Sequence, residues 1–117
     1  MDALRGITRG DLEQGFASAF AARTDGKPES TTVVECDDML MIRAHGTLTK
    51  SQGVLASRDP ALVSELSRAM LDDLAHEDLW RIAEELTGET VIAVLTDQSV
   101  DPDIALVCFV LGGPADA

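Results

Sequence analysis

Three side chains that lie close together in the chain have the chemistry to bind an anion: Arg43, His45 and Thr49. Arginine presents a planar fork of donors that matches carboxylate and phosphate groups, and histidine and threonine add further donors. These residues form a site only if the fold gathers them around a concave pocket. One hypothesis of function is therefore a small-ligand or anion-binding domain, which would include an enzyme, that uses these three residues.

Arg43 also has a structural interpretation, because it directly follows an apolar run. A charge this close to a core needs a partner or must extend to water. Glu35 would supply that partner if it lies across the hairpin that the sequence predicts. An ion pair, exposure at the strand end and a site for a ligand or protein partner all stay open for Arg43.

A second group of candidate ligands is the acidic segment between Asp97 and Asp103. Carboxylates of Asp97, Asp101 and Asp103 have the oxygen chemistry that hard cations prefer. The spacing lacks the glycine and the distal glutamate of a calcium loop, so a solvated loop between two strands is the alternative interpretation.

Motifs for other chemistry are missing from the chain. Neither the dinucleotide-binding glycine pattern nor the P-loop occurs, and there is no nucleophile elbow. Two histidines, His45 and His76, are too few for a rich zinc cluster. Cys36 and Cys108 match no metal or redox spacing, so we expect buried free thiols in a reducing compartment. We predict no catalytic residue, no metal and no cofactor, and the balance is against an enzyme.

Length and charge narrow the class of protein. The chain has 117 residues, 45% of them hydrophobic, which predicts one domain over residues 1–117 with an ordered core at about 8–111 and flexible termini. The chain has nine basic and 21 acidic residues, which gives a net charge of −12. This negative charge argues against nucleic acid and anionic lipid as partners. A basic protein partner would fit this charge.

The apolar runs are too short for a membrane protein. Residues 1–15 contain no apolar segment typical of a secretory signal. The longest apolar run, Ile104 to Leu111, is far below the roughly 20 residues of a membrane helix. We therefore predict a cytoplasmic protein without direct membrane insertion.

The periodicity of apolar residues predicts an α+β fold in the order α-β-β-α(-α)-β-β. We expect a mostly antiparallel four-stranded sheet of two hairpins with helices packed on it. The predicted elements are a helix over 11–23, strands over 31–36 and 39–45 joined by an Asp-Asp turn, strands over 90–96 and 104–111, and a loop over 97–103. The segment 47–57 is either irregular or a short helix that begins with a capping box at Thr49. A helical region begins at Asp59-Pro60, either bends or divides into two helices at 76–78, and ends at Thr87-Gly88.

The helical region has one apolar stripe, and its other residues are mainly acidic. Leu62, Leu66, Met70 and Leu74 recur every four residues and are predicted to face the core. Trp80 interrupts the charged pattern near the bend, either as a core residue or as an exposed anchor for a partner. The acidic residues form a solvated surface or a docking surface for a basic protein.

The last strand decides how the sheet must be covered. Residues 104–111 are apolar on both faces, and such a strand needs cover on both sides. Either helices lie on both faces of the sheet, or a second subunit covers one face. We predict a homodimer, and we place the interaction surface at residues 43–49 and their neighbours.

Three blocks of the sequence resemble a known family. They are Asp37-Asp38-Met39-Leu40 with Arg43, Gly46, Leu48 and Thr49; Glu84-Glu85-Leu86-Thr87-Gly88 with Val91; and Asp97 and Ser99 with Val107, Phe109 and Val110. In order and spacing they resemble the MpsC family, a small bacterial domain named as a component of a sodium-translocating, membrane-potential-generating system. Lys50, Ser51 and Gln52 stand where the family would have Pro-x-Glu.

The resemblance implies a role beside membrane ion transport and assigns no catalytic residue. With the absence of a reaction motif, it favours a non-enzymatic accessory or regulatory domain that acts through protein contacts. A membrane transport subunit is the partner that the resemblance implies.

Overall fold

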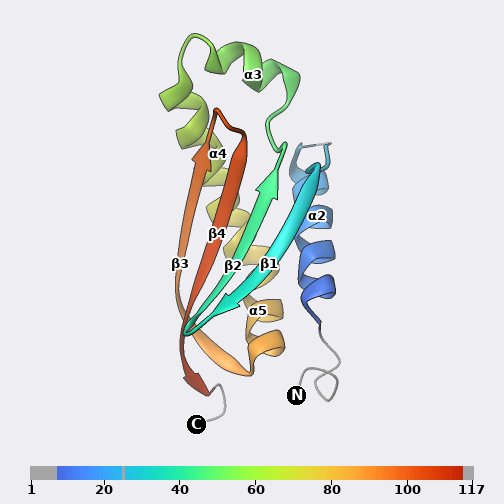
Figure 1. Cartoon of the computed structure of the whole chain (residues 1–117), viewed down its shortest axis with the longest axis vertical. Helices are drawn as coiled ribbons and strands as arrows, with labels where there is room; N and C mark the ends of the chain where they lie inside the picture. The colour runs from blue at the N-terminus through green and yellow to red at the C-terminus, as the bar shows by residue number, and fades with distance from the viewer. Residues whose placement is uncertain (1–7, 25, 115–117) are drawn as a thin grey trace.

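One antiparallel sheet forms the centre of the computed structural model, which describes residues 8–24 and 26–114 (Figure 1). The predicted class and element order are confirmed. In chain order the elements are α2 (Arg9–Thr24), β1 (Ser30–Cys36), β2 (Met39–His45), α3 (Lys50–Ala56), α4 (Pro60–Leu74), η1 (Ala75–Leu79), α5 (Trp80–Thr87), β3 (Glu89–Ser99) and β4 (Ile104–Pro114).

The strands lie in the order β1-β2-β4-β3, so the two hairpins meet along β2 and β4. All three strand pairs are antiparallel, and Ile42 aligns with Val33 on β1 and with Val107 on β4. Asp37 has a φ of 52° in the tight turn between β1 and β2, a conformation that aspartate tolerates. The predicted Asp-Asp turn is therefore confirmed.

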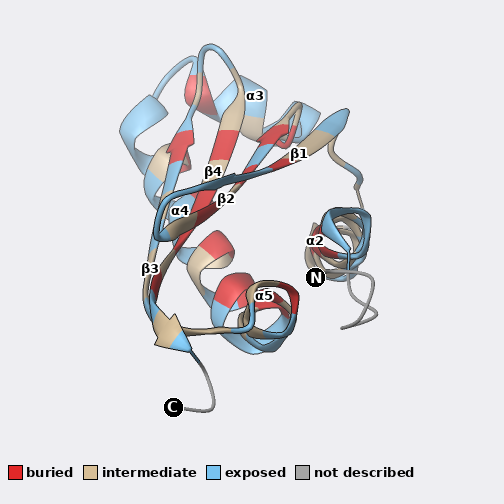
Figure 2. Cartoon of the chain, turned by 60° about the horizontal axis from the view of Figure 1, so that its bottom comes forward, coloured by how far each residue is buried: buried red, intermediate tan, exposed pale blue. Residues whose placement is uncertain are grey.

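Among the described residues, α2, α4 and α5 pack on the same side of the sheet (Figures 1 and 2). On β2 the alternation matches the prediction, because Leu40, Ile42 and Ala44 are buried beneath the helices and the residues between them point the other way. The buried face of the sheet packs against Phe16 of α2 and the apolar sides of α4 and α5. We call the opposite side of the sheet the outer face.

Local signals set the ends of the helices. Thr49 and Gln52 form the predicted capping box at the start of α3, and Asp59 caps α4 ahead of Pro60. The predicted bend is a turn of π-helix, η1, between α4 and α5. Gly88 ends α5 with a φ of 71°, the left-handed conformation that glycine adopts without a steric penalty.

The predicted apolar stripe of α4 is wrong at its first two positions. Leu62 and Leu66 are 38% and 57% exposed, whereas Val63, Leu71 and Leu74 are buried. A step of four residues turns about 40° past a full helical turn, because the helix has about 3.6 residues per turn. A stripe with strict four-residue spacing therefore winds around α4, and only its later part reaches the core.

The second hairpin is longer than its sequence pattern predicts. β3 continues through Ser99, so the predicted loop over 97–103 shrinks to its last few residues. Asp97 and Ser99 align with Leu106 and Ile104 as strand partners, so strand pairing overrides their turn propensity. β4 runs to Pro114, and residues 115–117 of the predicted flexible tail lie outside the described residues.

Candidate functional site

Arg43 and His45 lie on the outer face, two residues apart on β2. The Arg43 side chain is exposed, and His45 is half-buried. Within the described part of the chain, Arg43 forms no salt bridge or side-chain hydrogen bond. The predicted ion pair between Arg43 and Glu35 is wrong. Glu35 aligns with Leu40 and lies on the opposite face of the sheet, where its Oε1 is 3.4 Å from Nε of Arg9.

Thr49 lies beyond the end of β2 and has a local structural role. Its hydroxyl accepts a hydrogen bond from the Gln52 amide at 3.1 Å, and its own amide donates to the Gln52 side chain at 2.8 Å. Arg43 and His45 thus share a face of the sheet, while the Thr49 hydroxyl is engaged at the start of α3. The use of all three in one site stays a prediction.

The segment between His45 and Thr49 is fastened to the opposite hairpin by Asp103. The Asp103 carboxylate accepts hydrogen bonds from the Thr47 amide at 3.1 Å, the Thr47 hydroxyl at 2.9 Å and the Leu48 amide at 2.8 Å. The buried Gln98 side chain joins this network by donating to Asp103 at 3.3 Å. Sequence reasoning proposed Asp103 as a cation ligand and missed Thr47 and Gln98.

The three aspartates of the predicted cation site have different surroundings. Asp97 points from β3 to the outer face, and Asp103 is engaged in the network just described. Across residues 8–24 and 26–114, no three histidine, cysteine or acidic side chains gather closely enough to hold a metal ion. Asp101 is exposed in the turn between β3 and β4.

The outer face is an apolar surface with polar groups toward one end. Read across the sheet in the order β1, β2, β4, β3, its rows are Cys36, Met39, Val110 and Ala93; Val34, Met41, Cys108 and Leu95; Thr32, Arg43, Leu106 and Asp97; and Ser30, His45, Ile104 and Ser99. Among these residues, Arg43 and Asp97 carry a charge at neutral pH. They lie in one row, on either side of Leu106.

Several apolar side chains of this face contact water. Val34 is 41% exposed and Leu95 is 62% exposed. Ile92 is also 62% exposed, beside Gly112, where a side chain would collide with it. No helix of the described chain covers this face (Figure 2). A contiguous apolar surface of this kind is typical of a protein contact surface.

Cys108 lies in the middle of the outer face and is nevertheless buried, at 6% exposure. Its alignment with Met41 and Leu95 places it between two larger side chains. Burial, and to a smaller extent the Asp38 carboxylate, raise the pKa of the Cys108 thiol. Cys36 is exposed at the edge of the same face, because it lies on the edge strand β1, so the predicted burial of both thiols is wrong for Cys36.

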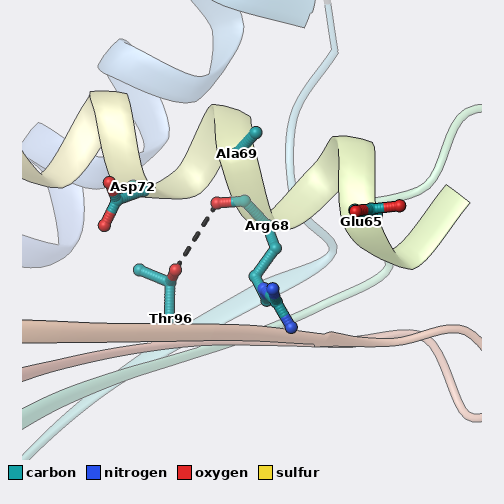
Figure 3. A pocket seen from close by; sticks show the side chains of 5 residues that line it. All are labelled: Glu65, Arg68, Ala69, Asp72 and Thr96. Carbon is teal, nitrogen blue, oxygen red and sulfur yellow. Dashed lines mark hydrogen bonds between the residues drawn. The ribbon is translucent and has the colours of Figure 1, made fainter. Parts of the chain in front are cut away.

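In the described part of the chain, cavities lie beside α4 and beside α3, away from the outer face. One, of about 330 Å³, is lined by Glu65, Arg68, Ala69, Asp72 and Thr96 between α4 and β3. Figure 3 shows Arg68 extending from α4 toward the sheet, with its carbonyl accepting a hydrogen bond from Thr96 at 3.4 Å. The other, of about 290 Å³, lies beside α3 and Val100. Neither cavity is lined by Arg43, His45 or Thr49.

The acidic residues near the bend have partners within the fold. Arg23 of α2 pairs with Glu77 and Asp78 and so holds η1 against the first helix. Trp80 is half-buried against the core, and its indole nitrogen donates to Glu84 at 3.3 Å. The interpretation of Trp80 as a residue that packs at the bend therefore fits the structure better than that of an exposed anchor.

Comparisons with known proteins give one match. The family model described as "Na+-translocating membrane potential-generating system (MpsC)" matches residues 8–112, which confirms the resemblance seen in the sequence blocks. No curated protein and no solved structure matches the chain. Within the described residues, no helix is long and apolar enough to cross a bilayer.

Proposed function

The chain belongs to the MpsC family, and from this membership we propose that it is a non-enzymatic accessory domain of a membrane ion-transport system. It acts through protein contacts, on the cytoplasmic side. A membrane transport subunit is its partner, and the domain itself works as a homodimer.

The outer face is the observation that carries this proposal. It is broad, mainly apolar and uncovered by helices in the described chain, with Arg43 exposed in its third row. Surfaces of this composition gain free energy when a protein partner removes them from water. The description of the family, a Na+-translocating membrane potential-generating system, supports membrane ion transport as the process.

The membrane potential of cells tests this function. In a strain that lacks the gene, we expect a potential-sensitive dye to report a lower potential in sodium medium than in the parent strain. The wild-type gene restores the potential, and the Arg43→Ala variant restores it only in part, because the exposed charge on the contact surface is lost. The matched control is Arg81→Ala, an exposed arginine on α5.

Two results would contradict the proposal. One is an unchanged potential in the deletion strain. The other is equal restoration by the Arg43→Ala and wild-type proteins at equal abundance, because Arg43 would then lie outside the contact that matters.

Anion binding that uses Arg43, His45 and Thr49 is a second candidate, in which Arg43 and His45 would bind the anion on the open outer face and Thr49 would have to leave its capping box to take part. One observation favours it: within the described residues the exposed Arg43 guanidinium has no acidic partner. Calorimetric titration with inorganic phosphate and with acetate tests it. A heat of binding in the wild type that is lost in the Arg43→Ala variant supports anion binding. The absence of a heat of binding in the wild type at millimolar phosphate and acetate contradicts it.

A further inference from the structure

The arrangement of charges on the outer face points to its occupant, and this inference rests on the proposed function. We propose that a second copy of this chain covers the face, with the two-fold axis running along β4 near Leu106. In this arrangement Arg43 of each copy lies opposite Asp97 of the other.

The register of the sheet supports this arrangement. Arg43 and Asp97 align with the same residue, Leu106, from opposite sides, so each is about 5 Å from β4. A half-turn about an axis along β4 exchanges the positions above β2 and β3. It brings Arg43 over the partner's Asp97 and Asp97 over the partner's Arg43, which forms two equivalent ion pairs.

The other rows match under the same rotation. Met41 lies opposite the partner's Leu95, and His45 lies opposite the partner's Ser99. Cys108 and Val110 lie on the axis and face their own counterparts. Each row thus meets the same row of the partner, so apolar rows meet apolar rows and the two rows with polar residues meet rows with polar residues.

Charge also favours a second copy over a basic partner. The chain has a net charge of −12, so two copies repel each other over most of their surfaces. On the outer face one positive and one negative side chain cancel, so this is a surface where two acidic copies can approach without a like-charge penalty. A basic protein would gain little electrostatic free energy by binding to a surface with no net charge.

The size of the contact predicts its strength. An axis along β4 overlaps three strands, β2, β4 and β3, over four rows of outward side chains. This gives a flat footprint of roughly 400 Å² per copy. Because stable interfaces bury about 800 Å² per partner, we expect a dimer that dissociates reversibly, with a Kd in the micromolar range.

Charge reversal tests the arrangement by sedimentation velocity. Arg43→Asp and Asp97→Arg each place like charges opposite each other at both pairs, and we expect each to weaken self-association roughly ten- to hundredfold. An equimolar mixture of the two variants restores both ion pairs in a heterodimer. The mixture should therefore associate with a Kd within about threefold of the wild-type value.

The control variant is Arg81→Glu, which gives the same net charge as Arg43→Asp but lies on α5. It should leave the Kd unchanged. Because Arg43, Asp97 and Arg81 are all exposed, circular dichroism should show the wild-type fold in every variant.

The possible results test the position of the dimer axis independently of the proposed accessory role. A wild-type dimer whose mixed variants fail to associate overturns the axis along β4. It would instead favour an axis between β2 and β4, which sets Arg43 against the partner's Leu106. A wild-type monomer overturns the dimer itself. Loss of membrane potential in the deletion strain would still support the accessory role in either case.

Discussion

At the scale of single residues, Asp103 has the clearest role, because its carboxylate joins the end of β2 to the second hairpin. It accepts from two amides and a hydroxyl of Thr47 and Leu48, and from the buried Gln98 side chain. Sequence reasoning could not find this role, since Thr47 and Asp103 are far apart in the chain. Gln98 lies in the segment that the sequence predicts to be a loop, so no sequence signal identified it either.

Replacing Asp103 with asparagine should lower the free energy of unfolding by about 2 kcal/mol, because hydrogen bonds to a charged group are lost and an amide donor then faces other donors. Urea denaturation followed by circular dichroism measures the change. Asp73→Asn, at an exposed position of α4, should change it by less than about 0.5 kcal/mol. Equal effects of the two substitutions would mean that the network contributes nothing specific.

The raised pKa of Cys108 predicts a pH dependence of stability. The folded state keeps the thiol proton to a higher pH than the unfolded chain does. Between the pKa of the unfolded chain and the raised pKa of the folded state, the folded state therefore binds more protons. Stability therefore falls as the pH rises above the ordinary thiol value of 9.0. Cys108→Ala should flatten the fall in unfolding free energy between about pH 8.5 and pH 10, whereas Cys36→Ala should not. Parallel pH profiles of wild type and Cys108→Ala would contradict this.

At the scale of elements, the sequence predicts most starts and ends correctly because they depend on local chemistry. The capping box at Thr49, the Asp59-Pro60 start and the left-handed Gly88 end are all decided within a few residues. The face of α4 and the length of β3 depend on distant contacts. Polar Gln98 and Ser99 join a strand because β4 pairs with them, which propensity alone does not reveal.

The rotated face of α4 predicts unequal effects of two leucine substitutions. Leu71→Ala should cost about 2–5 kcal/mol, because Leu71 is fully buried and a cavity remains. Leu66→Ala should cost less than about 1 kcal/mol, because its side chain is 57% exposed. Thermal and urea unfolding of both variants measure these differences. A larger loss of unfolding free energy for Leu66→Ala than for Leu71→Ala would contradict this, because it would mean that Leu66 is a core residue.

At the scale of the whole molecule, the layers explain why a small domain has a surface left over. One side of the sheet packs against α2, α4 and α5 (Figure 2). The other side carries apolar residues such as Val34, Met41 and Leu95. The sequence predicted this conflict, because residues 104–111 are apolar on both faces. The sequence left open whether helices or a second subunit cover the second face. In the part of the chain that the structure describes, the helices that pack on the sheet all lie on one side.

The candidate site was predicted less completely than the fold. Arg43 and His45 were identified from their chemistry and lie together on the outer face, but Asp97 was assigned to a loop. Its place opposite Arg43 across Leu106 follows only from the register of β4 with both neighbours. The spacing of residues along the chain does not determine which residues of distant strands align. The alignment of Arg43 and Asp97 with Leu106 on the outer face could therefore not be predicted from the sequence.

Sedimentation equilibrium of the wild-type protein tests most directly whether a second copy covers the outer face. At concentrations on the order of 100 µM, which exceed a micromolar Kd, the mass should approach twice the 12.4 kDa of the chain. The mass should fall toward 12.4 kDa on dilution. A mass of 12.4 kDa at every concentration would contradict the account.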